Sequence, residues 1–89
     1  MRLKDGFVIN KVGGAYVAVA VGERADEFHA LVRLNGTGAF LWELLSRGEC
    51  SREELTAALL REYDVSPELA AADTARFEEQ LRAGGLLDE

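Results

Sequence analysis

The chain has 89 residues, enough for one hydrophobic core and too few for two. Its 48% hydrophobic and 29% charged residues exclude an intrinsically disordered chain, and its formal charge of −6 argues against binding to nucleic acid through the phosphates. It has a single cysteine, no apolar segment of a secretory signal and no apolar run near the roughly 20 residues of a membrane span. These features predict a cytoplasmic protein that does not bind membranes.

The first half of the chain is predicted to form three β-strands. Two β-prone runs, residues 7–12 and 15–21, flank two consecutive glycines, which tolerate the positive φ angles of a two-residue hairpin turn. The polar residues 22–28 are expected to loop back to a short apolar strand at 30–34. This strand leads directly into a helix and is therefore held rigid, so an open outer edge would be able to pair with an incoming peptide.

Three helices are predicted to follow the strands. Asn35 can cap a helix over residues 36–47, in which apolar residues recur at helical spacing and Trp42 lies off the main apolar stripe. A second helix is expected after the capping box that begins at Ser51, and a third over residues 66–83. The order β-β-β-α-α-α predicts an α+β, winged-helix-like fold, with a three-stranded antiparallel sheet packed on three helices.

The sequence shows neither a linker nor an internal repeat, so residues 1–89 are expected to form one domain. No combination of side chains in it predicts catalysis. His29 stands without an acid–nucleophile pattern, and Cys50 has neighbours that supply neither a base nor the positive charge that activates a thiol. No Cys/His spacing suits a zinc ion, and no glycine pattern suits a phosphate loop. We therefore expect a protein without catalytic residues, metal or cofactor.

Several segments, taken in order, resemble the PqqD-like family, whose members recognise the precursors of ribosomally synthesised, post-translationally modified peptides (RiPPs). They are Asp5-Gly6-Phe7-Val8, the Gly13-Gly14 turn, residues 34–42, residues 60–65, and Asp73, Phe77, Leu81 and Gly85-Leu86-Leu87. Members that act in pyrroloquinoline quinone (PQQ) synthesis tend to carry Cys-Asp-Gly after the first helix. This chain has Ser46-Arg47-Gly48 there, which favours another peptide-maturation pathway.

The resemblance implies a non-catalytic adaptor that binds the leader segment of a precursor peptide and presents it to a separate modifying enzyme, often a radical SAM protein. In the family, the leader adds as an antiparallel strand to the third β-strand and packs against the third helix. Carried onto this sequence, the peptide-binding residues are Ala30, Leu31, Val32, Arg33 and Leu34 on the strand, and Asp73, Thr74, Phe77, Glu78 and Leu81 on the helix. Because Glu78 is acidic, it would pair with a basic leader side chain if it lines the groove.

Two other functions stay open from the sequence. A winged-helix DNA-binding regulator would use the second or third helix for recognition, although the third helix carries more acidic than basic residues. A structural subunit would bind a partner enzyme but not a free peptide. The oligomeric state is open as well, because an exposed strand edge permits either a monomer or a swapped dimer.

Overall fold

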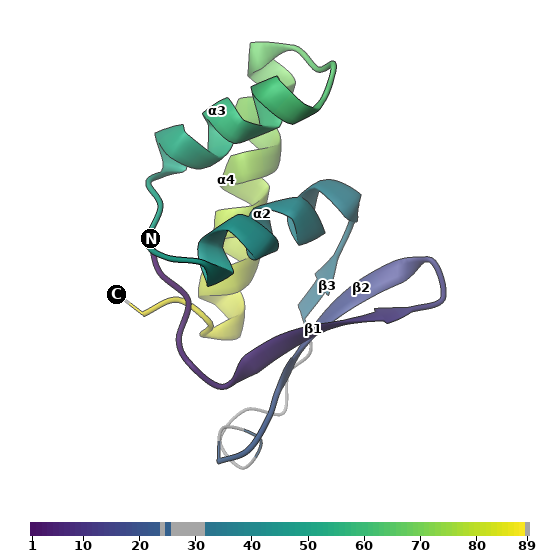
Figure 1. Cartoon of the computed structure of the whole chain (residues 1–89), viewed down its shortest axis with the longest axis vertical. Helices are drawn as coiled ribbons and strands as arrows, with labels where there is room; N and C mark the ends of the chain where they lie inside the picture. Colours follow the sequence, from purple (N-terminus) through teal and green to yellow (C-terminus); the bar gives the residue numbers. More distant parts are fainter. Residues whose placement is uncertain (24, 26–31, 89) are drawn as a thin grey trace.

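The structure is a computed structural model that describes residues 1–23, 25 and 32–88. The elements in chain order are β1 (Phe7–Val12), β2 (Ala15–Ala20), β3 (Val32–Leu34), α2 (Gly36–Ser46), α3 (Arg52–Glu62) and α4 (Pro67–Gly84). The predicted α+β fold, with three antiparallel strands followed by three helices, is confirmed within these residues. Figure 1 shows the helices gathered beside the twisted sheet, with the long helix α4 crossing behind α2.

The sheet has the order β1-β2-β3, so within the described residues β3 is an edge strand. The predicted hairpin is present, and Gly13 takes the positive φ of 63° that its turn needs. The predicted third strand is described only from Val32 onward, and Ala30 and Leu31 lie outside the described residues. In β3 the side chains of Val32 and Leu34 are buried while that of Arg33 is exposed, because successive strand residues point to opposite faces.

The helix boundaries follow the predicted caps. The Asn35 side chain accepts a hydrogen bond of 2.8 Å from the Gly38 N–H at the start of α2. Ser51 forms the complete capping box at the start of α3, and Ser66 caps α4. Gly85, with φ of 76°, takes the left-handed conformation that ends α4. These local signals therefore determine where the helices begin and end.

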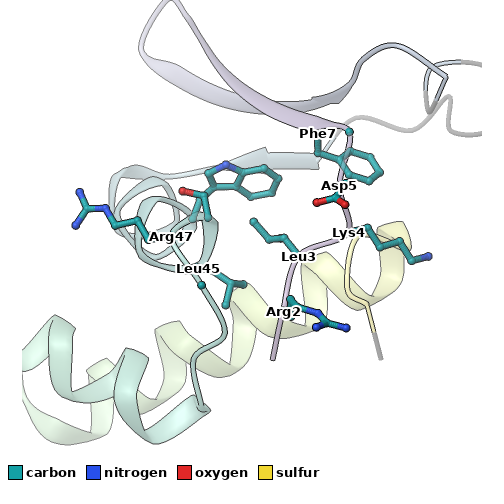
Figure 2. A pocket seen from close by; sticks show the side chains of 11 residues that line it. Arg2, Leu3, Lys4, Asp5, Phe7, Leu45 and Arg47 are labelled. Carbon is teal, nitrogen blue, oxygen red and sulfur yellow. The ribbon is translucent and has the colours of Figure 1, made fainter.

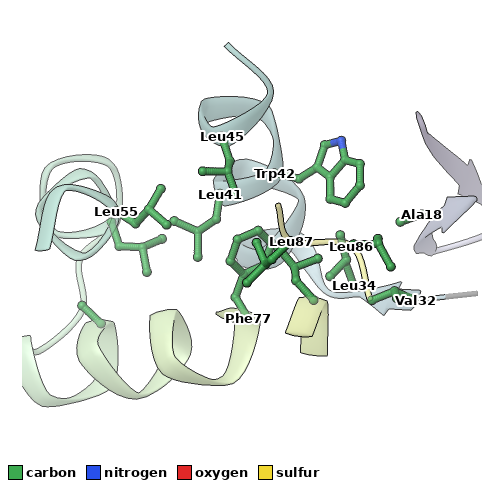
Figure 3. Close-up of a cluster of buried hydrophobic side chains, with 13 residues drawn as sticks. Ala18, Val32, Leu34, Leu41, Trp42, Leu45, Leu55, Phe77, Leu86 and Leu87 are labelled. Atoms are coloured by element: carbon green, nitrogen blue, oxygen red, sulfur yellow. The ribbon is translucent and has the colours of Figure 1, made fainter. Parts of the chain in front are cut away.

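One core joins the sheet to the helices α2, α3 and α4, and Figure 3 shows its side chains. Leu41 and Leu45, two of the apolar residues that recur along α2, are buried in it, together with Leu55 of α3 and Phe77 of α4. Trp42, which lies off the main apolar stripe, is also part of the core, with only 3% of its surface exposed. The sheet covers the side of α2 that carries Trp42. The buried face of α2 therefore extends beyond the apolar stripe seen in the sequence.

The two ends of the chain are joined by a pairing that the sequence did not indicate. Leu3 and Leu87 form an isolated antiparallel bridge, in which the Lys4 N–H donates to the Leu86 carbonyl and the Asp88 N–H donates to the Arg2 carbonyl, each at 2.8 Å. Leu87 and its neighbour Leu86 are thereby held in the core. No helix in the described part of the chain is both long and apolar enough to cross a membrane.

Candidate functional site

The direction of each peptide group in β2 follows from the hairpin. Val12 and Ala15 face each other across the two-residue turn, which makes them a hydrogen-bonded pair of the antiparallel ladder. The same alternation brings the Val21 N–H onto the Gly6 carbonyl, at 2.8 Å. The odd-numbered residues of β2 therefore turn their N–H and C=O groups toward β1, and the even-numbered residues turn theirs toward β3.

The outer edge of β3 is defined by the same alternation. Val32 lies opposite Ala18 and Leu34 lies opposite Tyr16, so both residues of β3 exchange hydrogen bonds with β2. Arg33 lies opposite Val17 in the non-hydrogen-bonded position. Its N–H and C=O therefore point away from the sheet, to the edge where a further strand can add.

Helix α4 lies against this edge. The side-chain amide of Gln80 donates a hydrogen bond to the carbonyl oxygen of Arg33, at 3.3 Å. Four residues further on, Gly84 comes so close to β3 that a Cβ atom there would lie 2.8 Å from the Cγ2 atom of Val32. This close approach sets the spacing between α4 and the strand.

An open cleft of about 380 Å³ lies where the end of β3 and the turn between β1 and β2 face α4. Its lining residues are Gly14, Ala15, Arg33, Leu34, Asn35, Arg76 and Gln80. Arg33 and Arg76 are both exposed, and neither guanidinium forms an ion pair with any residue that the structure describes. The site therefore combines an open strand edge, a concave surface and two available positive charges.

Three of the helix residues predicted to line a peptide groove lie in the core instead of at its surface. Thr74 and Leu81 are completely buried and Phe77 is 2% exposed. The hydroxyl of Thr74 donates to the Ala70 carbonyl within α4, at 2.9 Å. In this conformation the three side chains support the wall of the cleft from inside, while Asp73 is half-buried.

Glu78 is also turned inward, and its carboxylate is occupied. Its Oε1 accepts a hydrogen bond of 2.8 Å from Arg52 Nε, and its Oε2 accepts from the Nη2 atoms of Arg52 and Arg82, at 3.0 and 2.9 Å. The hydrogen bond from Arg52 and then that from Arg82 lower the pKa of Glu78 to about 2, against the opposing effect of burial. The carboxylate that was expected to meet a basic leader side chain thus ties α4 to the start of α3.

Cys50, one of the two residues considered for catalysis, is partly buried and lies within the described part of the chain. Burial, with a smaller effect from Glu54, raises the pKa of the Cys50 thiol above its usual value, which disfavours the reactive thiolate. His29 lies outside the described residues. Among the residues that are described, no three His, Cys, Asp or Glu side chains are grouped to hold a metal ion.

A second cleft, of about 320 Å³, lies between the N-terminal segment and the end of α2. Figure 2 shows Leu3 and Leu45 directed toward its interior, with Arg2 and Lys4 near its rim. Arg2 is engaged with the carboxylate of Asp88, at 2.8 Å. This cleft is separate from the β3 edge.

Comparison with protein families identifies the chain. The sequence pattern described as coenzyme PQQ synthesis protein D (PqqD) matches residues 8–87. The chain belongs to the PqqD family. A search of curated proteins gives no match to this PqqD-family chain.

Two solved structures share the fold of this PqqD-family chain. One is described as TbiB1 in complex with the TbiA(beta) leader peptide, with a TM-score of 0.72 and 24% identity over 99% of this chain and 95% of that chain. The other is lasso peptide synthetase B1 complexed with the leader peptide, with a TM-score of 0.67 and 24% identity over 96% of this chain and 93% of that chain. At this identity the likeness establishes the architecture.

The two α4 residues of the cleft were not predicted from the sequence of this PqqD-family chain. Arg76 and Gln80 are spaced one helical turn apart, and each adjoins a residue of the buried stripe. Apolar periodicity directs attention to the buried Phe77 and Leu81, which are their immediate neighbours. The signal that could have indicated Arg76 and Gln80 is the row of polar residues that runs beside that stripe at the same four-residue spacing.

Proposed function

We propose that this PqqD-family chain is a non-catalytic adaptor that binds the leader segment of a ribosomally synthesised precursor peptide and presents it to a separate modifying enzyme. Residues 1–89 act as one peptide-recognition domain, and the leader adds as an antiparallel strand to the outer edge of β3. The observation that carries the proposal is the outward N–H and C=O of Arg33, next to the cleft formed with α4. The two leader-peptide complexes with the same fold support it.

Strand addition suits an adaptor because its affinity comes from the backbone, while pockets for alternate side chains provide specificity. The leader residue opposite Arg33 accepts from its N–H and donates to its C=O. The residues on either side of it turn toward α4, where Arg76 and Gln80 face them. No group of this chain needs to act on the peptide, so the chemistry belongs to the partner enzyme, for which a radical SAM protein is one candidate.

The proposal is tested by an Arg33→Pro substitution. Proline lacks the N–H and is tolerated on an edge strand, so this variant should fold and lose leader binding. Arg33→Gln is the matched control, because it keeps the N–H. Titration of the labelled proteins by NMR, with leader peptides from short reading frames beside the gene, measures both folding and affinity. A folded Arg33→Pro variant that binds a leader as tightly as the wild type would contradict strand addition.

A Val32→Pro substitution tests the side of β3 that pairs with β2, in contrast to the outer edge tested by Arg33→Pro. The N–H of Val32 faces β2 and its side chain is buried, so proline there should unfold the domain. If the wild type binds the modifying enzyme tightly and none of the leaders, the structural-subunit alternative replaces the proposal.

We do not favour nucleic acid as a partner. Arg52 and Arg82 share the carboxylate of Glu78, and Arg2 pairs with Asp88, so a phosphate that bound these cations would have to replace existing ion pairs. The formal charge of −6 opposes the same contacts. Salt-dependent binding to duplex DNA would restore the regulator alternative, and its absence would remove it.

A further inference from the structure

The charged residues of the cleft next to β3 are positive, whereas the whole chain is negatively charged. Arg33 and Arg76 are the charged lining residues of the cleft among those described, whereas the protein carries a formal charge of −6. Two other arginines near α4 are already engaged within the fold, since Arg52 and Arg82 share the carboxylate of Glu78. Arg33 on the exposed face of β3 and Arg76 on α4, neither with an acidic partner among the described residues, therefore place a positive charge on each side of the edge where a peptide adds.

Strand geometry determines which leader side chains meet these two charges. A residue paired directly with Arg33 in an antiparallel ladder projects its side chain to the same face of the sheet as Arg33, with Cβ atoms about 5 Å apart. The residues before and after it project to the opposite face. That face is the one against which α4 packs, and it brings them toward Arg76.

We propose that the leader recognised by this chain is acidic at these positions, with an Asp or Glu opposite Arg33 and a second acidic residue immediately beside it in sequence, facing Arg76. The inference rests on the proposed function, since it assumes that the peptide adds at the β3 edge. Two adjacent acidic residues are placed on opposite faces of the added strand, so each guanidinium has its own partner. Such pairs are exposed and each contributes about two- to fivefold in affinity.

A selection from random peptides tests the inference and does not require the natural precursor. The immobilised wild-type protein is used to select binders from an mRNA-display library of peptides with about 14 randomised residues, a length that spans the short edge strand with room on both sides. Each selected peptide is then measured by fluorescence anisotropy against the wild type and against Arg33→Gln, Arg76→Gln and Arg33→Pro. Arg61→Gln is the matched control, because it removes one exposed arginine from α3, away from the cleft.

The expected result is enrichment of adjacent acidic residues. Affinity should fall by about two- to fivefold in each of Arg33→Gln and Arg76→Gln, remain unchanged in Arg61→Gln, and weaken as salt is added. Peptides that lose binding in Arg33→Pro but show no acidic enrichment, and bind Arg33→Gln like the wild type, would overturn the acidic preference and leave strand addition intact. If no selected peptide is sensitive to Arg33→Pro, the proposed function itself fails.

Discussion

The side-chain amide of Gln80 donates a hydrogen bond to the backbone carbonyl of Arg33, at 3.3 Å, and so occupies the outward acceptor of the β3 edge. The two residues are 47 positions apart in the sequence, on α4 and on the edge strand. Edge strands commonly protect their unpaired backbone groups from unwanted association. An added strand would need this same acceptor, so a leader must displace Gln80 from it.

Replacement of Gln80 by alanine should therefore increase leader affinity. The substitution removes the internal competitor, and a neutral hydrogen bond of this kind contributes about 0.5–1.5 kcal/mol, which corresponds to roughly two- to tenfold in affinity. Isothermal titration of Gln80→Ala against a bound leader peptide measures the change. Glu79→Ala is the control, because it truncates the neighbouring exposed side chain of α4. A loss of affinity in Gln80→Ala would mean that Gln80 contacts the leader instead of competing with it.

The contact between Gly84 and β3 should not tolerate a larger residue. An alanine Cβ at position 84 would lie 2.8 Å from Val32 Cγ2 and 2.9 Å from Leu86 Cδ1, and both of these side chains are buried. The free energy of unfolding of Gly84→Ala should fall by about 1–3 kcal/mol, as for other overpacked sites. Urea denaturation followed by circular dichroism measures this.

The Gly36→Ala variant is the control for Gly84→Ala. Gly36 lies in the first turn of α2, and nothing lies within 4 Å of an added Cβ. Because alanine favours the helix over glycine, the substitution should leave stability unchanged or raise it by up to about 1 kcal/mol. Equal stabilities of the Gly84→Ala and Gly36→Ala variants would contradict the close packing of α4 on β3.

The carboxylate of Glu78 should matter for stability more than for peptide binding. Glu78→Gln keeps the shape of the side chain but removes the charge that holds Arg52 and Arg82. Hydrogen bonds to charged groups contribute about 1.5–3 kcal/mol, so a decrease of this order in the free energy of unfolding is expected. Leader affinity, measured on the folded variant, should change by less than about twofold. A stable variant with strongly altered affinity would instead place Glu78 in the groove.

Acid should destabilise the protein through the same group. The pKa of Glu78 is about 2 in the folded chain, below its usual value of 4.5, so the unfolded chain takes up the proton first as the pH falls. The contribution of Glu78 is complete above about pH 4.5 and is lost as the pH falls through about 2. Between these values the wild type should lose stability faster than Glu78→Gln. Parallel curves in urea denaturation would show that other groups account for the acid sensitivity.

Local signals in the sequence were sufficient for most of the fold. Gly13, Asn35 and Ser51 act on their immediate neighbours, and the turn and helix starts that they predict are present. Trp42 is buried although it lies off the apolar stripe of α2, because the sheet, which is a tertiary partner, determines which side of the helix is covered. The pairing of Leu3 with Leu87 joins residues at the two ends of the chain, and no local pattern indicates it.

Less of the candidate site than of the fold could be predicted from the sequence. The resemblance indicated the strand, but the register that turns the peptide group of Arg33 outward and that of Val32 inward emerges only when β2 and β3 are paired. Glu78 looked like a groove residue because its partner Arg52 lies 26 positions away, on another helix. The prediction for Ala30 and Leu31 stays a prediction, since both lie outside the described residues.

The most direct test of strand addition is the hydrogen exchange of one backbone amide. The Arg33 N–H points to the open edge, so NMR should find that it exchanges fast in the free protein, while the amides of Val32 and Leu34, which face β2, are protected. Saturation with a bound leader should slow exchange at Arg33 by at least about tenfold, since it then donates to the added strand. Unchanged exchange at Arg33 with a fully bound leader would contradict the account.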